Sequence, residues 1–427
     1  MVAGSIWLGS GPAGAVDWQV LYRLSESLRV SDNIQNSDDR RQGGGVGGGD
    51  GQQGGASAGI GFSSSTNAAL DVMARTPTET WLTTGNIGHT IFFGEGVPAQ
   101  RERTTLSARS NLLKTTLDTD YNLSAHYSMV PATRSFLRDP RDPDLTDPDV
   151  TDPDLLDPDL VDPEFPGPIF ADIPLALLEF DRINYGARGG LVHRRTRADV
   201  LSLSARATRS DFSGDAADTA VPLTVLEVSG GWTRLMTRRV DGRARASVRY
   251  VQSGDEDGAQ RMIYSGTVGT NFRATRRLTM DANVGVSVTD LHQSGDGTTG
   301  GPPQSDGSVS FTGDIRLSYT PWRDTSVAVS FSQRVLTDSL GEVSTRQAVR
   351  GTAAYRINDL SSINVLGTFI NSDAASGQTQ AWSVSPSYQH ALSQYWDLSL
   401  SYRFVKTDTA QSNAALLTLS HRGTLLP

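Results

Sequence analysis

The 427-residue chain contains no cysteine, so disulfide bonds and thiolate metal sites are excluded. It contains no run of about 20 apolar residues, which excludes an α-helical membrane span. Its six histidines lack the spacing of metal ligands. Only 37% of its residues are hydrophobic. The net charge of −9 argues against a nucleic-acid partner.

What the sequence has instead is a strict alternation of apolar and polar residues. From Leu278 to Thr289 every even position is apolar and every odd position is polar or glycine. Because successive side chains of a strand point to opposite faces, such a segment has one apolar face and one polar face. The pattern recurs from Trp18 to about Leu419. A wall between hydrocarbon and water has this pattern, so we predict a transmembrane, antiparallel, up-and-down β-barrel.

Eighteen segments fit the pattern, and sixteen or twenty strands are also compatible with it. The expected strands are 17–30, 56–65, 68–76, 103–113, 117–130, 182–194, 198–211, 222–235, 242–253, 260–273, 277–290, 307–320, 324–336, 344–356, 360–371, 378–391, 395–407 and 412–423.

Two kinds of connection alternate between these strands. Tight turns are expected at positions such as 65–67, 195–197 and 275–277, and long polar loops at 31–55, 77–102, 131–181, 212–221 and 291–306. Bacterial outer-membrane barrels have short periplasmic turns and long external loops. We therefore expect a barrel in the outer membrane of a Gram-negative bacterium, with both termini periplasmic. Its expected surroundings are outer-membrane lipid and lipopolysaccharide.

Residues 1–15 have the features of the end of a secretory signal, with Ala13-Gly14-Ala15 as the expected cleavage site. The barrel is then expected over 16–423, followed by a C-terminal tail over 424–427. The loop 31–55 is rich in glycine, which predicts a flexible tether.

The loop 131–181 contains a five-residue repeat that begins with Asp-Pro-Asp. Proline at every fifth residue excludes helix and strand pairing, so we interpret the loop as an acidic spacer. The alternative is a docking element for an envelope protein complex, or a loop that binds Ca²⁺. The carboxylates concerned are Asp142, Asp144, Asp147, Asp149, Asp152, Asp154, Asp157 and Asp159. No other cofactor is expected.

The face opposite the apolar one is rich in arginine. Its thirteen arginines are Arg23, Arg29, Arg188, Arg206, Arg243, Arg245, Arg249, Arg273, Arg316, Arg334, Arg350, Arg356 and Arg403. Its seven acids are Asp71, Asp118, Asp120, Glu227, Asp281, Asp314 and Asp397. Eighteen strands leave a water-filled lumen, and arginines that line a pore favour anions.

The residues expected to select anions are Arg243, Arg245 and Arg249, followed by Arg206, Arg273 and Arg316. The first three share one strand with no acid between them. The alternative is that lumenal arginines pair with lumenal acids and stiffen the wall. Because so wide a pore is usually narrowed, loop 77–102 or loop 131–181 is expected to fold inward. Glu26 falls on the apolar face, and the alternation offers no explanation for it.

The segment from Leu21 to Asn33 resembles the first strand of plugless outer-membrane β-barrels associated with exopolysaccharide and exosortase systems. Those barrels often open with an aromatic- and serine-rich strand that runs into an Asp-Asn pair, here Asp32-Asn33. The resemblance implies passage of a polymer across the outer membrane. We therefore expect a non-enzymatic, porin-like conduit for anionic solutes or exported polysaccharide. The alternative is a structural barrel that anchors or sheathes a larger envelope or surface complex through its acidic repeat.

Overall fold

A computed structural model describes residues 16–31, 61–94, 102–133, 178–213, 222–254, 259–292, 308–337, 343–374, 377–407 and 411–426. Within these ranges the chain forms eighteen strands. They are β1 (Asp17–Ser31), β2 (Gly61–Arg75), β3 (Glu79–Gly94), β4 (Glu102–Thr115), β5 (Thr119–Thr133), β6 (Leu178–Arg194), β7 (Asp199–Ser213), β8 (Leu223–Thr237), β9 (Val240–Ser253), β10 (Ala259–Arg273), β11 (Leu278–His292), β12 (Ser308–Trp322), β13 (Thr325–Thr337), β14 (Val343–Asn358), β15 (Ser361–Ala374), β16 (Gly377–Ala391), β17 (Trp396–Thr407) and β18 (Gln411–Leu426). No helix in the described ranges is long and apolar enough to cross a membrane.

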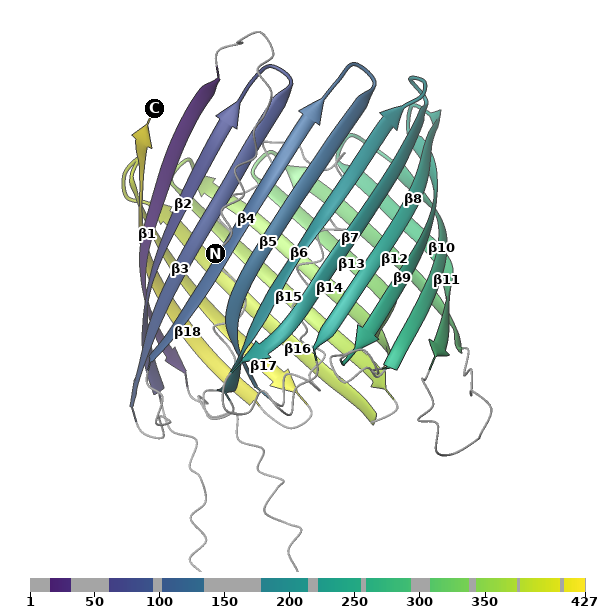
Figure 1. The fold of residues 1–427 in the computed structure, drawn as a ribbon. Helices are drawn as coiled ribbons and strands as arrows, with labels where there is room; N and C mark the ends of the chain where they lie inside the picture. The colour runs from purple at the N-terminus through teal and green to yellow at the C-terminus, as the bar shows by residue number, and fades with distance from the viewer. Residues whose placement is uncertain are drawn as a thin grey trace, which may run out of the picture.

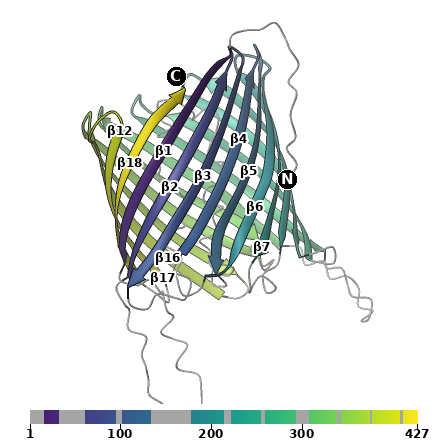
Figure 2. The same cartoon turned by 60° about the vertical axis from the view of Figure 1, so that its left-hand side comes forward.

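Each described strand pairs antiparallel with the next one along the chain, and β18 pairs with β1 (Figure 1). The closing register runs from Val20 opposite Leu426 to Ser31 opposite Ala414. The strands are inclined to the barrel axis, as the turned view in Figure 2 also shows. The predicted all-β antiparallel barrel of about 18 strands is confirmed.

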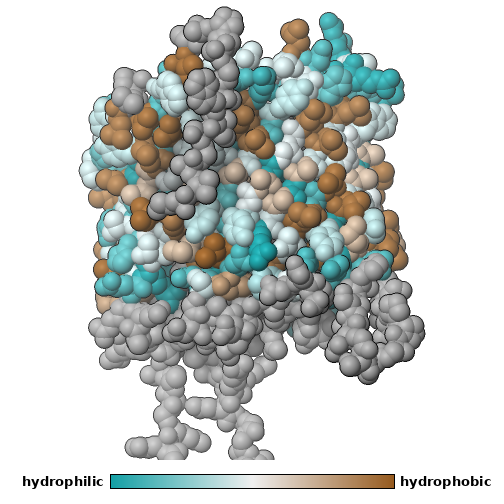
Figure 3. All heavy atoms as spheres, in the orientation of Figure 1, coloured by the Kyte–Doolittle hydropathy of each residue, from teal (hydrophilic) through white to brown (hydrophobic). Residues whose placement is uncertain are grey.

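The outer wall of the barrel is apolar. The side chains of Val284 and Phe311 are 62% and 73% exposed, and both point outward, on the parity predicted for their strands. Apolar and pale residues predominate across the middle of the face drawn in Figure 3. Trp18 and Trp81 meet edge to face on this wall, with ring centroids 6.1 Å apart. So much exposed apolar surface is matched by a hydrocarbon environment.

Between its charged residues, the inner wall carries small hydroxyl side chains that hydrogen-bond across strands. Ser27 Oγ and Thr418 Oγ1 lie 2.9 Å apart on β1 and β18, and Ser265 Oγ and Ser287 Oγ lie 2.6 Å apart on β10 and β11. Similar bonds join Ser65 to Thr90 and Ser204 to Ser229. Small side chains leave the centre of the barrel open, and their mutual bonds stabilise a polar surface that faces the lumen.

Tight turns lie at one end of the barrel, which we call the tight-turn end. They are at 76–78, 116–118, 195–198, 238–239, 274–277, 323–324, 359–360 and 392–395. β1 begins and β18 ends at this same end, which is at the top of Figure 1. At the opposite end, the loop end, the strands enter the ranges that are not described.

Two errors in the predicted segmentation cancel in the strand count. The predicted turn at Ser65-Thr66-Asn67 is wrong, because β2 is continuous through these residues and pairs with β1 on one side and β3 on the other. The predicted long loop 77–102 is also wrong, because most of it is β3. The true turn lies at 76–78, where Thr76 N–H donates to Glu79 O at 2.8 Å.

Since 79–94 is part of the wall, the predicted inward-folded loop 77–102 does not exist as a constriction. The predictions for the Gly-rich loop 31–55, the repeat in 131–181 and the signal segment 1–15 fall almost entirely outside the described residues.

Candidate functional site

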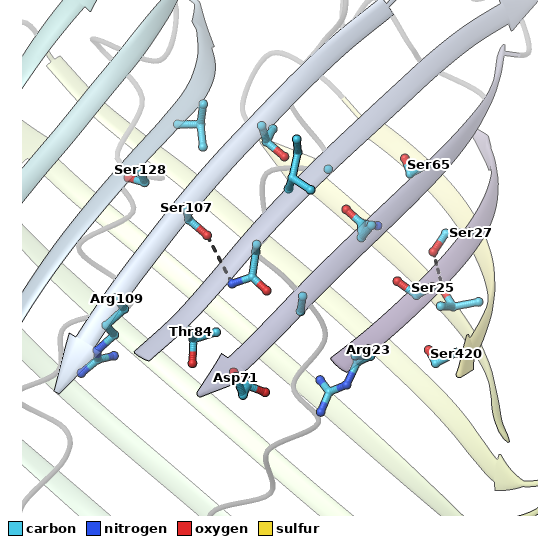
Figure 4. A pocket seen from close by; sticks show the side chains of 18 of the residues that line it. Arg23, Ser25, Ser27, Ser65, Asp71, Thr84, Ser107, Arg109, Ser128 and Ser420 are labelled. Carbon is cyan, nitrogen blue, oxygen red and sulfur yellow. Dashed lines mark hydrogen bonds between the residues drawn. The ribbon is translucent and has the colours of Figure 1, made fainter. Parts of the chain in front are cut away.

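The lumen contains a cavity of about 1580 Å³ lined by β1–β9 and by parts of β14–β18. Figure 4 shows polar side chains that project into it from β1–β5 and β18. Asp71, Thr84 and Arg109 occupy one row of this wall, on β2, β3 and β4, because Thr84 lies opposite both of the others. His126 of β5 lies opposite Arg109 and continues the row.

A second row of charged residues crosses the middle of β6–β9. Arg188 lies opposite Arg206, Arg206 opposite Glu227, and Glu227 opposite Arg249. Arg249 donates from Nε and Nη2 to Glu227 Oε2, at 3.0 and 2.9 Å. Four adjacent strands thus hold three guanidinium groups and one carboxylate at the same place on the inner wall. We call Arg188, Arg206, Glu227 and Arg249 the arginine row.

The other end of β9 belongs to a more acidic network. Arg243 Nε donates to Asn283 Oδ1 at 2.7 Å, and Arg243 also forms an ion pair with Asp281. Asn283 Nδ2 donates in turn to Asp314 Oδ2 at 2.9 Å. Arg243 reaches across the intervening strand because Gly269, directly opposite it, has no side chain. A Cβ at Gly269 would collide with Asn283 Oδ1.

The residues predicted to select anions therefore differ in their surroundings. Two of them bind carboxylates on other strands, Arg249 on the adjacent β8 and Arg243 on β11, although no acid separates them along β9. Arg245 Nη2 donates to Ser229 Oγ at 3.3 Å. Arg273, 3.7 Å from Asp241, lies at the tight-turn end.

Arg316, the remaining predicted residue, borders this acidic network on its β12 side. It lies between Asp281 of β11 and Ser330 of β13, and Ser330 lies opposite Arg350 of β14. Arg346, Arg350 and Arg356 follow one another along the inward side of β14, and Arg334 lies opposite Arg346 on β13. The inward positions of β13–β16 carry no carboxylate within their described residues. This part of the wall is basic from the loop end to the tight-turn end.

Several arginines on the inner wall were missed by the sequence prediction. Arg109 and Arg182 both line the cavity, on β4 and β6, and Arg103 lines it near the loop end of β4. On β4, Leu106 and Leu112 point outward and define which positions face the lumen. Their parity would have predicted that the arginines of this strand point inward. Arg182 lies at the edge of the predicted strand, where the parity is hardest to read.

The predicted calcium or docking carboxylates of the acidic repeat lie outside the described residues. Within the described ranges, no group of three or more histidine or acidic side chains could hold a metal ion.

No protein-family model matches the chain, and no curated protein is similar to it. Among solved structures it is similar to many chains, including three Pseudomonas aeruginosa proteins. OccK8 (OprE) has 9% identity and a TM-score of 0.44, with 96% of this chain and 99% of that one covered. OpdQ has 8% identity and a TM-score of 0.45, with 96% and 100% covered. OpdK, solved with vanillate, has 10% identity and a TM-score of 0.44, with 96% and 99% covered. The similarity is limited to the barrel shape.

Proposed function

We propose that this chain is a passive channel of the Gram-negative outer membrane that conducts anionic solutes or exported polysaccharide. The tight-turn end then faces the periplasm and the loop end faces the outside, since outer-membrane barrels have this asymmetry. The proposal assigns the chain the transport of a charged solute and no catalytic step.

The arginine row is the observation that carries the proposal. The row contains three arginines and one acid, and Glu227 binds Arg249, so its four side chains carry a formal charge of +2 near mid-height. The basic inner face of β14 adds Arg350 at a similar height on another part of the wall. Fixed positive charge in a narrow, water-filled space attracts anions and repels cations. Pairing of Arg243 and Arg249 with acids supports the view that these two also stiffen the wall.

Single-channel conductance of the purified chain in a planar bilayer, under a salt gradient, tests the proposal. We expect open steps with a reversal potential that indicates anion preference. Arg206→Glu should lower the anion-to-cation permeability ratio several-fold, because it reverses one charge in the arginine row. Arg276→Glu is the matched control, since Arg276 is exposed in the turn 274–277 outside the lumen. Cation preference in the unmodified chain, or equal effects of both substitutions, would contradict the proposal.

The acidic repeat motivates the alternative of a structural barrel. A correctly folded chain that never conducts, and that co-purifies with envelope proteins only when residues 142–163 are present, would favour that alternative.

A further inference from the structure

Glu26, which the alternation did not explain, belongs to a row of polar side chains on the outer wall. It lies opposite Thr66 of β2, Thr66 lies opposite His89 of β3, and His89 lies opposite Thr104 of β4. Ser64 is the next outward residue of β2 toward the loop end. We call Glu26, Ser64, Thr66, His89 and Thr104 the outer polar island.

The members of the outer polar island bind one another. Ser64 Oγ donates to Glu26 Oε1 at 2.5 Å, and Thr66 Oγ1 donates to Glu26 Oε2 at 2.5 Å. His89 Nδ1 and Thr104 Oγ1 lie 3.3 Å apart. Glu26, Thr66 and His89 are nevertheless exposed. A carboxylate has about four acceptor positions, so two hydroxyl donors leave Glu26 able to accept further hydrogen bonds.

Apolar residues border the β1–β3 part of the island on both sides. Toward the loop end, Leu28 is 53% exposed, and the rings of Phe62 and Phe93 stack with centroids 5.9 Å apart. Toward the tight-turn end lie Leu24, 49% exposed, and Ile87, 51% exposed. On β1–β3 the island is therefore bordered by apolar residues on both sides, whereas on β4 the next outward residue after Thr104 toward the loop end is Glu102.

The polar row on β14–β16 differs in this respect. Gln347, Asn371 and Gln380 lie opposite one another on the outer wall of these strands. The next outward residues toward the loop end are again polar, Asp373 on β15 and Gln378 on β16. This row lies at the edge of the apolar wall, where headgroups begin. The island on β1–β3 has no such explanation, because the next outward residues there are apolar.

A charged side chain that faces hydrocarbon is unfavourable, and such residues usually contact protein or water. We propose that the outer polar island is the contact surface for a second copy of this chain in the membrane. The island carries an acid and a base on either side of β2, so it is complementary to itself. In the proposed pair, the two copies are related by a two-fold axis that runs along the membrane normal and passes near β2. Glu26 of each copy then faces the side of the other copy on which His89 lies. The exposed leucines and phenylalanines around the island then pack against their counterparts. The contact does not depend on what passes through the lumen.

Because the chain has no cysteine, single cysteines can report the contact directly. Ala68 is the outward residue next to Thr66 on β2, close to the expected axis but outside the island. Ala68→Cys should give a disulfide-linked or bismaleimide-linked species of twice the monomer mass in isolated outer membranes. Val286→Cys, on the outer wall of β11 across the barrel, is the control and should stay monomeric. Heat-modifiable migration verifies that both variants fold.

The carboxylate is tested on the Ala68→Cys background. Glu26→Leu should reduce the linked fraction about threefold or more, the size expected of a polar contact between membrane segments. Asp373→Leu removes an outward carboxylate elsewhere and should leave the linked fraction unchanged. Equal linking through Val286→Cys, a product between Ala68→Cys and a different protein, or insensitivity to Glu26→Leu would each overturn the proposal.

Discussion

A single arginine on the lipid-facing wall tests the assignment of the two barrel faces. Val284 lies in the middle of β11, opposite Val268 of β10, and its side chain is 62% exposed. Val284→Arg would place a guanidinium near the bilayer midplane, where arginine on a barrel costs about 2–4 kcal/mol. At 25 °C this corresponds to a loss of about 30- to 700-fold in the ratio of folded to unfolded chain. The assay is urea titration of the barrel in lipid vesicles, read by heat-modifiable migration.

Thr267→Arg is the matched control for Val284→Arg. Thr267 lies on β10 next to Val268, but it points into the lumen, opposite Gly285 and Arg245. An arginine there faces water, and we expect a loss of less than about 1 kcal/mol, since lumen substitutions mainly tune selectivity. Equal destabilisation by both substitutions, or none by Val284→Arg, would refute the face assignment.

Three further predictions concern the lumen and the acidic repeat. Glu227→Gln should increase anion preference in the bilayer assay, because the arginine row then holds no carboxylate; an unchanged reversal potential would show that the row does not control ion choice. Gly269→Val should separate Arg243 from Asn283 and shift the backbone of β10 and β11 locally, because its Cβ would also lie 2.5 Å from Ala282 O; with heat-modifiable migration retained we expect altered conductance, and wild-type conductance would contradict a role for this bridge. Deletion of residues 142–163 should leave heat-modifiable migration intact, since the described strands close without them, and its loss would show that the repeat supports the fold.

The inward and outward faces of most strands could be predicted from the sequence, because the alternation of apolar and polar residues is read within each strand alone. Two errors arose where a strand had polar residues on both faces. The outward Ser64 and Thr66 interrupt the apolar parity of β2, so the sequence suggested a turn. β3 was missed because Thr83 and Gly85 occupy outward positions and give little apolar signal. The hydroxyl groups of Ser64 and Thr66, which suggested a turn in β2, are the groups that bind Glu26. The wrongly predicted turn and the unexplained carboxylate therefore belong to the same outward polar cluster.

Contacts between strands were predictable only where a tight turn sets the register. Glu227 and Arg249 flank the turn 238–239 at nearly equal distances along the chain, so their opposition follows from the position of that turn. The opposition of Asp281 and Arg316 is different, because residues 293–307 intervene between β11 and β12 and leave the register open.

Glu26 and Thr66 are separated in the same way, by residues 32–60 between β1 and β2. An unfavourable outward carboxylate was therefore visible in the sequence, but the hydroxyls that bind it were not. Sites where local rules fail are often functional, and only the register shows that Glu26 is one of a set of five. That set has the polarity expected of a protein contact within the apolar wall, which is why the association of two copies is the inference that the outer face supports.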